Sequence, residues 1–470
     1  MLKIFDTLSQ KNKPLKKTKT FLRLFVCGPT VYDYAHIGHA RTYVAFDMVV
    51  KYLRNRGYKV NYLQNITDID DKLIERSREE NVEMTGLARK FERAYFEDMA
   101  ALNITSVDNY ERASDYITQI IEQIKLLIER GFAYETTTGV YFRVSKFKEY
   151  GKLSGQNLKN LRRAVGIEED TTKLDSVDFA LWKKKKENNE PAWQSPWGDG
   201  RPGWHIEDTA ITSTVFGGPQ YEIHGGARDL IFPHHEAEIA QMESAYGIYP
   251  MVDHWMHTGF LRIGGEKMAK SLKNFITIRD ILRVYSPETL RVFFTTKLYR
   301  SPIDYIENSL KEAEMVERRL AEFWHNIKKH EIGVINQESK KIRRDNKIYK
   351  NYIKKFWAEL EDDFNTPKAF SELFNMIRAA NSELARETLS KNDTKLINSF
   401  IREMNGIFGV VNEQKLRGEQ IPKNIQKLAE RRKKLRTEKK FEEADKVRKE
   451  MEQMGYEIKD APEDMQIKKK

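Results

Sequence analysis

"FVCGPTVYDYAHIGHART", residues 25–42, joins an apolar run to the start of an expected helix and decides the fold. The run "TFLRLFVCGPT" (20–30) is short, apolar and bounded by a Gly-Pro pair, which predicts a buried strand. Apolar residues then recur at helical spacing over about 36–56, and a basic last turn followed by glycine predicts the end of this helix. "YKVNYLQNIT" (58–67) predicts a second strand. A strand, a helix and a strand within about fifty residues form a βαβ unit, so we expect a parallel sheet covered on both faces.

Further along the chain, the pattern predicts an interrupted sheet domain. Amphipathic helices are expected over about 84–102 and 113–130, and a hairpin over 132–144. From there to about residue 200 the chain is irregular and rich in Lys and Trp, which indicates an insertion that splits the sheet domain. "PQYEIHGGARDLIF" (219–232) predicts a further strand of the sheet, followed by another helix. Beyond about residue 280 the pattern is helical almost throughout, and no repeat of fixed period is present.

The composition bounds the class of protein. At 470 residues, with no signal peptide and no apolar run near the ~18 residues that span a bilayer, the chain predicts a cytoplasmic protein of about three domains, with no membrane partner. A formal charge of +11 favours a polyanionic partner only weakly. Cys27 is the single cysteine, so it is a buried small hydrophobe, a reactive thiol or a metal ligand.

Two histidines mark the start of the first expected helix. His36 and His39 are three residues apart and share one face, where backbone N–H groups and the helix dipole favour an anion. Imidazole N–H groups there could meet a triphosphate, and Gly38 would let a flat base approach the backbone. The alternative is a pair of surface histidines or histidines satisfied within the core.

A glycine-flanked basic segment, "GGEKMAKSLKN" (264–274), follows about 230 residues later. It carries Lys267, Lys270 and Ser271, and such a loop could swing ammonium groups onto a pyrophosphate leaving group. On its own it is more simply a solvated cluster of charges.

Together "HIGH" (36–39) and "KMAKS" (267–271) resemble the two signature motifs of class I aminoacyl-tRNA synthetases. The strings "CGPTVYDYAHIGHART", "NITDIDDKLIERS", "GRPGWHIE", "IHGGARDLIFPHHEAEIAQ", "YRSPIDYIENSL" and "DDFNTPKA" occur in the family's order along the chain, and over essentially the whole chain the sequence resembles the cysteinyl-tRNA synthetase family. The resemblance implies an α/β fold with a Rossmann-like parallel-sheet catalytic domain split by an insertion, followed by an all-α helical bundle and a small C-terminal anticodon-binding module. The implied parts are the first half of the catalytic domain (1–115), a connective insertion for the acceptor end (116–202), the second half with the KMAKS loop (203–280), a stem-contact segment with the helical bundle (281–415) and the C-terminal module (416–470).

The same resemblance implies a reaction and its residues. ATP and L-cysteine would give cysteinyl adenylate and pyrophosphate, and the aminoacyl group would pass to the 3′ end of a cysteine tRNA. The catalytic residues would be His36, His39, Lys267 and Lys270. The ATP-binding residues would be Gly38, Gly226, Asp229, Lys270 and Ser271, with Mg²⁺ bridging the phosphates. A turn or helix cap is the alternative for Asp229.

The resemblance also implies a zinc ion that ligates the substrate thiolate. Cys27, His234 and Glu238 match three of its ligands, and His234 and Glu238 are i and i+4 on one helix face. His235 points some 100° around that helix, which favours a supporting or packing role. Where the family reads "GWHIEC" this chain reads "GWHIED", so Asp208 replaces the second thiolate. A Cys/Asp/His/Glu zinc site remains possible, although two carboxylates shift the preference toward harder ions, and metal-free selection by pocket shape is the competitor.

The other substrate contacts are expected from Trp204 and from the basic C-terminus. Trp204 would line the amino-acid pocket with Cys27 and His234, or else belong to the core. "DDFNTPKAFSELFNMIRAAN" (362–381) predicts a turn followed by an amphipathic helix. Residues 431–440 would contact tRNA phosphates or form a solvated helix face. Competing functions are a cysteine ligase with a non-tRNA acceptor and a catalytically silent tRNA-binding paralogue; a monomer is expected by default.

Overall fold

The computed structural model separates into two compact units, Met1–Val410 and Val411–Lys470. The residues that it describes are 1–18, 20–157, 170–187, 190–267, 274–335, 347–416, 423–438, 440–460 and 465–469.

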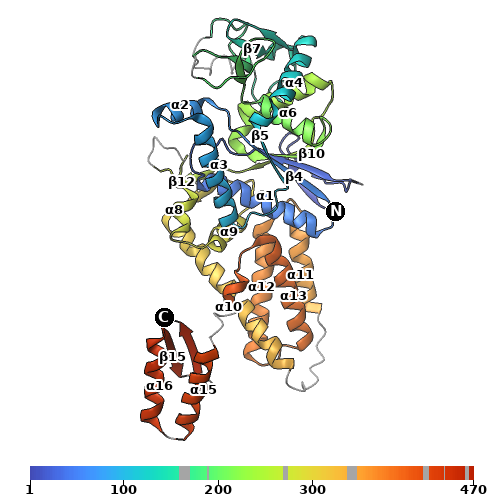
Figure 1. Ribbon diagram of the computed structural model, residues 1–470. Coiled ribbons are helices and arrows are strands. Elements are labelled where there is room, and N and C mark those ends of the chain that lie inside the picture. The colour runs from blue at the N-terminus through green and yellow to red at the C-terminus, as the bar shows by residue number, and fades with distance from the viewer. Residues whose placement is uncertain are drawn as a thin grey trace. The chain divides into compact units, whose positions relative to one another are not determined.

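The first unit is built on the predicted parallel sheet, which has five strands in the order β11-β10-β3-β4-β5 (Figure 1). Every pairing in it is parallel, and Phe25 of β3 lies in register with His224 of β10 on one side and Leu63 of β4 on the other. The strands are β3 (Leu22–Val26), β4 (Val60–Ile66), β5 (Asn109–Arg112), β10 (Tyr221–Ala227) and β11 (Val252–Thr258). β5 and β11, the two edge strands, are absent from the expectations drawn from the sequence.

Helix α1 (Ile37–Asn55) connects β3 to β4 and begins within one residue of its predicted start. His36 is its N-cap, and the chain turns out of the helix at Gly57, where φ is +80°. Such a φ suits glycine because it carries no Cβ. The predicted strand, helix and strand are therefore confirmed. α1 covers one face of the sheet, and α6 (Ile206–Val215) and α7 (Glu236–Tyr246) lie on the other side of it in Figure 1.

Between the two halves of the sheet lies a second, antiparallel sheet in the order β6-β7-β8-β9. The predicted hairpin is its first pair, β6 (Ala133–Glu135) with β7 (Gly139–Phe142). The expectation that the chain is irregular from there to about residue 200 is wrong, because β8 (Phe179–Lys184) and β9 (Gly200–Pro202) pair onto β7. A run of lysines (183–186) begins within β8, so its local pattern is weak and its pairing with β7 decides its structure.

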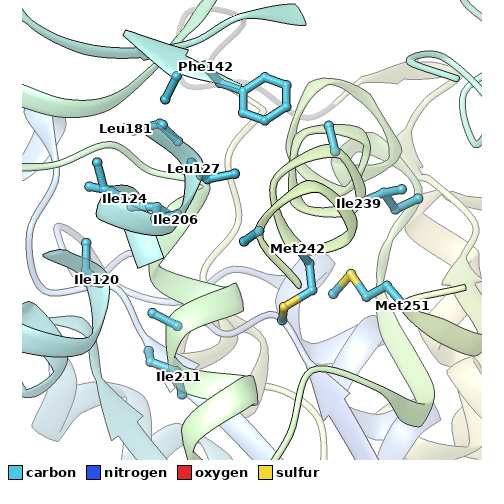
Figure 2. Packing of buried hydrophobic residues seen from close by; sticks show 14 of the residues in the cluster. Ile120, Ile124, Leu127, Phe142, Leu181, Ile206, Ile211, Ile239, Met242 and Met251 are labelled. Carbon is cyan, nitrogen blue, oxygen red and sulfur yellow. The ribbon is translucent and has the colours of Figure 1, made fainter. Parts of the chain in front are cut away.

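A shared apolar core ties this insertion to the helices of the main sheet (Figure 2). Helix α4 (Ile117–Glu129) contributes Ile120, Ile124 and Leu127 from the predicted apolar stripe, and all three are fully buried. They belong to one cluster with Phe142 of the insertion. The same cluster contains Leu181, Ile206, Ile211, Ile239, Met242 and Met251. The insertion therefore shares a continuous apolar core with the sheet domain.

Helices dominate the chain beyond the sheet, as predicted. The longest are α10 (Glu307–Ile335), α11 (Lys347–Leu360), α12 (Thr366–Ala385) and α13 (Lys391–Phe408). α12 starts at the predicted turn, where the side chain of Asn365 accepts the N–H of Lys368 and Pro367 occupies the first turn. The other α-helices and strands described in the first unit are β1 (Lys3–Asp6), β2 (Lys11–Pro14), α2 (Asp71–Glu79), α3 (Met84–Ala101), β12 (Leu261–Ile263), β13 (Glu266–Lys267), α8 (Ile278–Leu282), α9 (Pro287–Thr295) and β14 (Ile303–Tyr305).

The second unit is a helical pair with a hairpin. Its elements are α14 (Glu413–Leu416), α15 (Lys423–Thr437), α16 (Phe441–Gln453), β15 (Tyr456–Asp460) and β16 (Met465–Lys469). Ile425 and Ala429 of α15 pack with Val447 and Met451 of α16. Arg432 is only 2% exposed, so one residue of the basic stretch 431–440 belongs to the interior of this unit.

A buried ion pair joins α1 to α9. Arg291 Nη2 lies 2.7 Å from Asp47 Oδ2, both side chains are fully buried, and Arg291 Nε donates to the Phe408 carbonyl at the end of α13. Replacing Arg291 with methionine leaves Asp47 with only Lys51 as a charged partner among the described residues. We therefore expect Arg291→Met to lower the free energy of unfolding by about 3–5 kcal/mol. Urea denaturation followed by circular dichroism measures this free energy of unfolding. Arg283→Met, at an exposed position, is the control. Equal midpoints for the two variants would contradict the expectation.

Candidate active site and metal centre

The candidate site lies at the carboxyl ends of β3 and β10, the two neighbouring strands from which the chain crosses over in opposite directions. From β3 the chain crosses to β4 on one side, and from β10 it crosses to β11 on the other. Ligands of open parallel sheets bind in the crevice at this position. Cys27 follows β3 directly, and Gly226 lies near the carboxyl end of β10.

The histidine pair caps the amino-terminal end of α1. His36 Nδ1 accepts the N–H groups of Gly38 and His39, at 3.1 and 3.3 Å, and His39 Nδ1 accepts the N–H of His36 at 3.3 Å. The two rings stack with centroids 3.8 Å apart. Because each Nδ1 is an acceptor, each neutral ring carries its proton on Nε2. Burial lowers the pKa of His39 to about 4, so at neutral pH it is an uncharged donor.

The chain that follows the KMAKS segment (267–271) returns to this histidine pair. Ile37 donates its N–H to the Ile276 carbonyl at 3.1 Å, and Ile278 donates to the Ala35 carbonyl at 3.0 Å. The ring of Phe275 meets His36 edge-on. Lys270 and Ser271 lie outside the described residues. The backbone of Lys267 ends β13, and its side chain also lies outside the described part.

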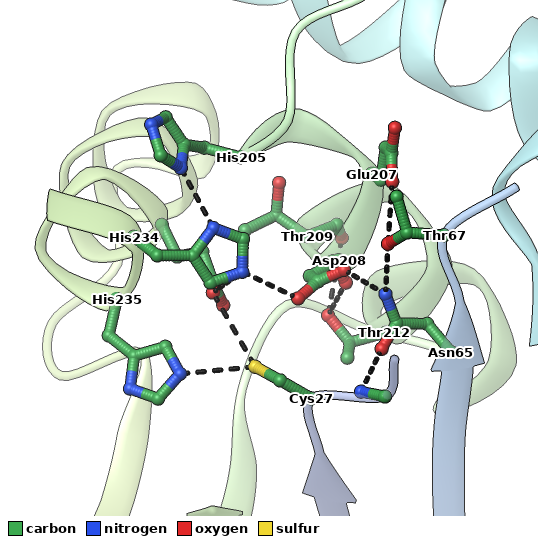
Figure 3. A network of polar contacts seen from close by, with 12 residues as sticks. Cys27, Asn65, Thr67, His205, Glu207, Asp208, Thr209, Thr212, His234 and His235 are labelled. Carbon is green, nitrogen blue, oxygen red and sulfur yellow. Dashed lines mark hydrogen bonds and ion pairs between the residues drawn. The ribbon is translucent and has the colours of Figure 1, made fainter. Parts of the chain in front are cut away.

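The four predicted metal ligands come together in one buried group. Figure 3 labels three of them, Cys27, Asp208 and His234. The ligand atoms of Cys27, Asp208, His234 and Glu238 all lie within 4.8 Å of one another, and no side chain of the four is more than 5% exposed. His234 Nε2 is 3.0 Å from Asp208 Oδ2 and 3.1 Å from Glu238 Oε1. The i, i+4 spacing of His234 and Glu238 thus places both on one side of the chain, although His234 belongs to a π-helical turn (Ile231–His235) that precedes α7.

The electrostatics of this group suit a cation. Burial raises the pKa of the Cys27 thiol well above its ordinary value, and the charges of Glu238 and Asp208 raise it further. Burial, with the charge of Asp208, likewise raises the pKa of Glu238. Glu238 Oε2 is fully buried and accepts no hydrogen bond from a described residue. Three acidic donors and an imidazole in so little space fit a divalent metal, whose charge would favour their deprotonated forms.

The rings of Trp204 and His205 lie against His234, one of the predicted ligands. Its Nδ1 is 2.8 Å from Nδ1 of His205, and the ring of Trp204 stacks on it with centroids 4.2 Å apart. Trp204 is 38% exposed, so it is not a core residue and covers the solvent side of His234.

His235 lies closer to the metal group than its angle on the helix suggests. Its Nε2 is 3.0 Å from Cys27 Sγ, and its Nδ1 is 2.8 Å from His257 Nε2. His224 Nε2 is 3.5 Å from the same sulfur. The ligand atoms of Cys27, His224, His235 and Glu238 also lie within 4.8 Å of one another. The sequence does not single out His224 and His257, and only their positions in "YEIHGG" and "HWMHT" could have pointed to them.

Gly226 and Asp229, which are predicted to hold adenosine, lie in different surroundings. A Cβ on Gly226 would lie 2.8 Å from Cε1 of His235, so the ring of His235 is one reason for a glycine there. Asp229 is exposed and lines a cavity of about 590 Å³ together with Arg228 and Phe260. A cavity of this size accommodates a ligand as large as a nucleotide.

Comparisons with known proteins agree with this architecture. Residues 12–315 match the family described as tRNA synthetases class I (C) catalytic domain, and residues 355–412 match the DALR domain. A cysteine–tRNA ligase of Pyrococcus abyssi is 44% identical over 98% of this chain and 97% of its own length, and one of Methanococcus maripaludis (strain C7) is 43% identical over 100% and 99%. A solved Mycobacterium tuberculosis methionyl-tRNA synthetase, in complex with methionyl-adenylate, superposes with a TM-score of 0.64 at 17% identity, covering 83% of this chain and 91% of that one. Among the described residues, no helix is both long and apolar enough to cross a membrane. The full-length similarity to curated relatives, together with the matched catalytic domain, shows that the chain belongs to the cysteinyl-tRNA synthetase family.

Proposed function

We propose that the protein activates L-cysteine with ATP and transfers the resulting cysteinyl group to the 3′ end of cysteine tRNA. The observation that carries this proposal is the placement of two sites at the carboxyl end of one strand, β3. The capped histidine pair of α1, suited to phosphates, and the buried ligand group around Cys27, suited to a thiolate-binding metal, both follow β3. Family membership supports the same reaction.

In the first step the cysteine carboxylate attacks the α-phosphorus of ATP, and the bond to pyrophosphate breaks. A carboxylate is already a nucleophile, so no side chain need accept a proton. Nε2–H of His36 and of His39, with the amino-terminal end of α1, would donate to the phosphates as charge moves onto pyrophosphate. Lys267 and Lys270 would supply positive charge to the same group, and Mg²⁺ bound with ATP would add to that charge.

The remaining residues predicted to bind ATP are assigned to the nucleoside and its surroundings. Gly38 would lie under the base, and Asp229 would accept the ribose hydroxyl protons from its exposed position beside the 590 Å³ cavity. Gly226 would leave room for the nucleoside, and Ser271 would contribute a hydroxyl from the KMAKS segment.

We propose that the metal is zinc, held by Cys27, Asp208, His234 and Glu238. When bound, it would ligate the substrate thiolate and so separate cysteine from serine, which a pocket without metal rejects by only ~10²-fold. One thiolate, one imidazole and two carboxylates remain an ordinary zinc donor set despite Asp208. Trp204, stacked on His234, would form a wall of the amino-acid pocket.

Zinc content tests this assignment directly. Protein prepared with zinc present is expected to contain close to one equivalent, because the buried ligand group offers four donors within 4.8 Å. Elemental analysis measures the ion after extensive dialysis. Less than about a tenth of an equivalent would exclude zinc and favour selection by pocket shape.

Pyrophosphate exchange tests the reaction. The protein should exchange ATP and pyrophosphate in the presence of cysteine, far more weakly with serine, and then charge tRNA. A catalytically silent tRNA-binding paralogue would show no exchange. A ligase for a small acceptor such as an amino sugar would exchange but leave tRNA uncharged.

The remaining segments are assigned to tRNA. Residues 116–202 would meet the acceptor end, residues 281–415 the stem, and residues 416–470 the anticodon. The DALR match over 355–412 supports a tRNA-contacting helical region. We further propose that the protein acts in the cytoplasm as a monomer, the usual state of the family.

The basic face of α15 offers a test of the anticodon assignment. Arg431 and Lys434 are exposed and three residues apart, whereas Arg432 is interior, so reversing the first two leaves the core intact. We expect Arg431→Glu with Lys434→Glu to weaken tRNA binding and to reduce the slope of log K against log salt by about 1 for each phosphate that the variant no longer binds. Lys446→Glu with Lys449→Glu on α16, also exposed and three residues apart, is the matched control. Loss of cysteine-dependent exchange in the double variant would contradict the domain assignment.

A further inference from the structure

Asn65 links the two chain segments that carry the metal ligands Cys27 and Asp208 (Figure 3). It lies near the carboxyl end of β4 and is 2% exposed. Its Oδ1 accepts the N–H of Gly28, the residue after Cys27, at 2.6 Å. Its Nδ2 donates to Asp208 Oδ1, also at 2.6 Å. A backbone N–H can only donate, so the bond to Gly28 fixes which end of the amide faces Asp208.

The two carboxylate oxygens of Asp208 therefore have different partners. Oδ1 is occupied by the amide of Asn65, and Oδ2 lies 3.0 Å from His234 Nε2, on the side of the ligand group. We propose that Asn65 is a positioning residue that presents a single oxygen of Asp208 to the metal. The inference rests on the proposed metal site and adds the residue that orients its unusual ligand.

An aspartate needs such a partner more than a cysteine does. A thiolate offers one donor atom, whereas a carboxylate offers two and can rotate between one-oxygen and two-oxygen binding. Ligating carboxylates are usually hydrogen-bonded by a second side chain that fixes their orientation. Asn65 would serve here because an amide can donate to a carboxylate while accepting from the backbone.

The surroundings hold Asn65 in place. A Cβ on Gly28 would lie 1.6 Å from the Asn65 carbonyl oxygen, so the ends of β3 and β4 are in direct backbone contact. Asn65 Nδ2 is also 3.2 Å from Thr67 Oγ1, and Thr67 Oγ1 donates to Glu207 Oε2 at 3.1 Å. Thr67 thus engages the acidic neighbour of Asp208, so that each of the two adjacent carboxylates has its own donor.

A double-mutant cycle on the full-length protein tests the proposal. Zinc affinity is measured by competition with a chromophoric chelator in the unmodified protein, Asn65→Ala, Asp208→Cys and the double variant. Asn65→Ala should weaken zinc binding about 10–100-fold when Asp208 is present and less than about 3-fold in the Asp208→Cys background. The absorption spectrum of bound Co²⁺ should change with Asn65→Ala only in the Asp208 background.

Two controls separate this role from a general effect on folding. Asn61→Ala removes an asparagine of the same strand whose side chain pairs with Asn109, and it should leave zinc affinity unchanged. Asn65→Asp keeps an acceptor for Gly28 but faces Asp208 with a second carboxylate, and it should weaken binding at least as much as Asn65→Ala. Equal losses in both backgrounds, or none in either, would overturn the proposal. Absence of zinc binding by the unmodified protein would instead overturn the metal assignment on which it rests.

Discussion

Replacement of His39 by alanine is expected to slow cysteine-dependent ATP–pyrophosphate exchange by about 10²–10³-fold, mainly through kcat. His39 Nδ1 is occupied by the backbone N–H of His36, so its Nε2–H is the group left to meet a phosphate. This donor is held in place before ATP arrives, by the stacked ring of His36 and by the capping hydrogen bonds. Alanine removes the donor and the ring that orients His36.

A second substitution separates the donor from the ring. His39→Gln can place an amide N–H near the position of Nε2, so we expect it to retain more activity than His39→Ala. Affinity for tRNA should stay unchanged in both variants. An exchange rate for His39→Ala within a few-fold of the unmodified enzyme would refute the assignment of His39 to the phosphates.

The ionisation of His39 adds a pH signature. Burial lowers its pKa from the ordinary 6.5 to about 4. Between these two pH values His39 therefore stays neutral in the folded protein but binds a proton in the unfolded chain. The contribution of neutral His39 to stability is therefore complete above pH 6.5 and is lost as the pH falls toward 4. The acid-induced fall in melting temperature should be shallower for His39→Ala over this interval. No ionisation of His39 should appear in kcat near neutral pH.

The sequence predicts the parts of this fold that depend on local patterns. The strand and helix around residues 22–55 follow from an apolar run, a cap and a terminal glycine, all of which act within a few residues. Strand β8 and the edge strands β5 and β11 are stabilised by partners distant in the chain, so no local pattern specifies them. Strands β15 and β16 are short and rich in charged residues, and they too are absent from the sequence-based expectations.

For the site as well, residues close together in the sequence can be predicted, whereas residues brought together by the tertiary structure cannot. His234 and Glu238 can be placed together because they are four residues apart on a helix, and the resemblance supplies Cys27 and Asp208. The histidines of β10 and β11 are not predicted because strand order, which brings both strands to the same side of β3, is a tertiary property. Asn65 is not predicted because its partners, Gly28 and Asp208, come from two other segments.

Replacement of Cys27 by alanine is expected to have the largest effect on amino-acid selection. Cys27 Sγ lies 3.0 Å from His235 Nε2 and 4.0 Å from Glu238 Oε1, and Cys27 is the one residue of the chain that can supply a thiolate. Without it the group keeps two buried carboxylates and an imidazole, a harder donor set that binds zinc less well. We expect zinc affinity to fall by at least about 100-fold and KM for cysteine to rise by a similar factor. Discrimination against serine should then drop to the ~10²-fold that pocket shape provides.

Chelation of the unmodified protein is the control that distinguishes metal loss from damage to the pocket. Metal-stripped protein should reproduce the high KM for cysteine, and added zinc should restore the unmodified protein but not Cys27→Ala. Exchange measured at saturating cysteine should fall much less than kcat/KM, because the histidine pair proposed to bind the phosphates is intact in both. If stripped protein and Cys27→Ala both keep the original KM and the original preference over serine, then cysteine is selected without the metal, by shape alone. In that case the buried group around Cys27 serves the fold rather than the substrate.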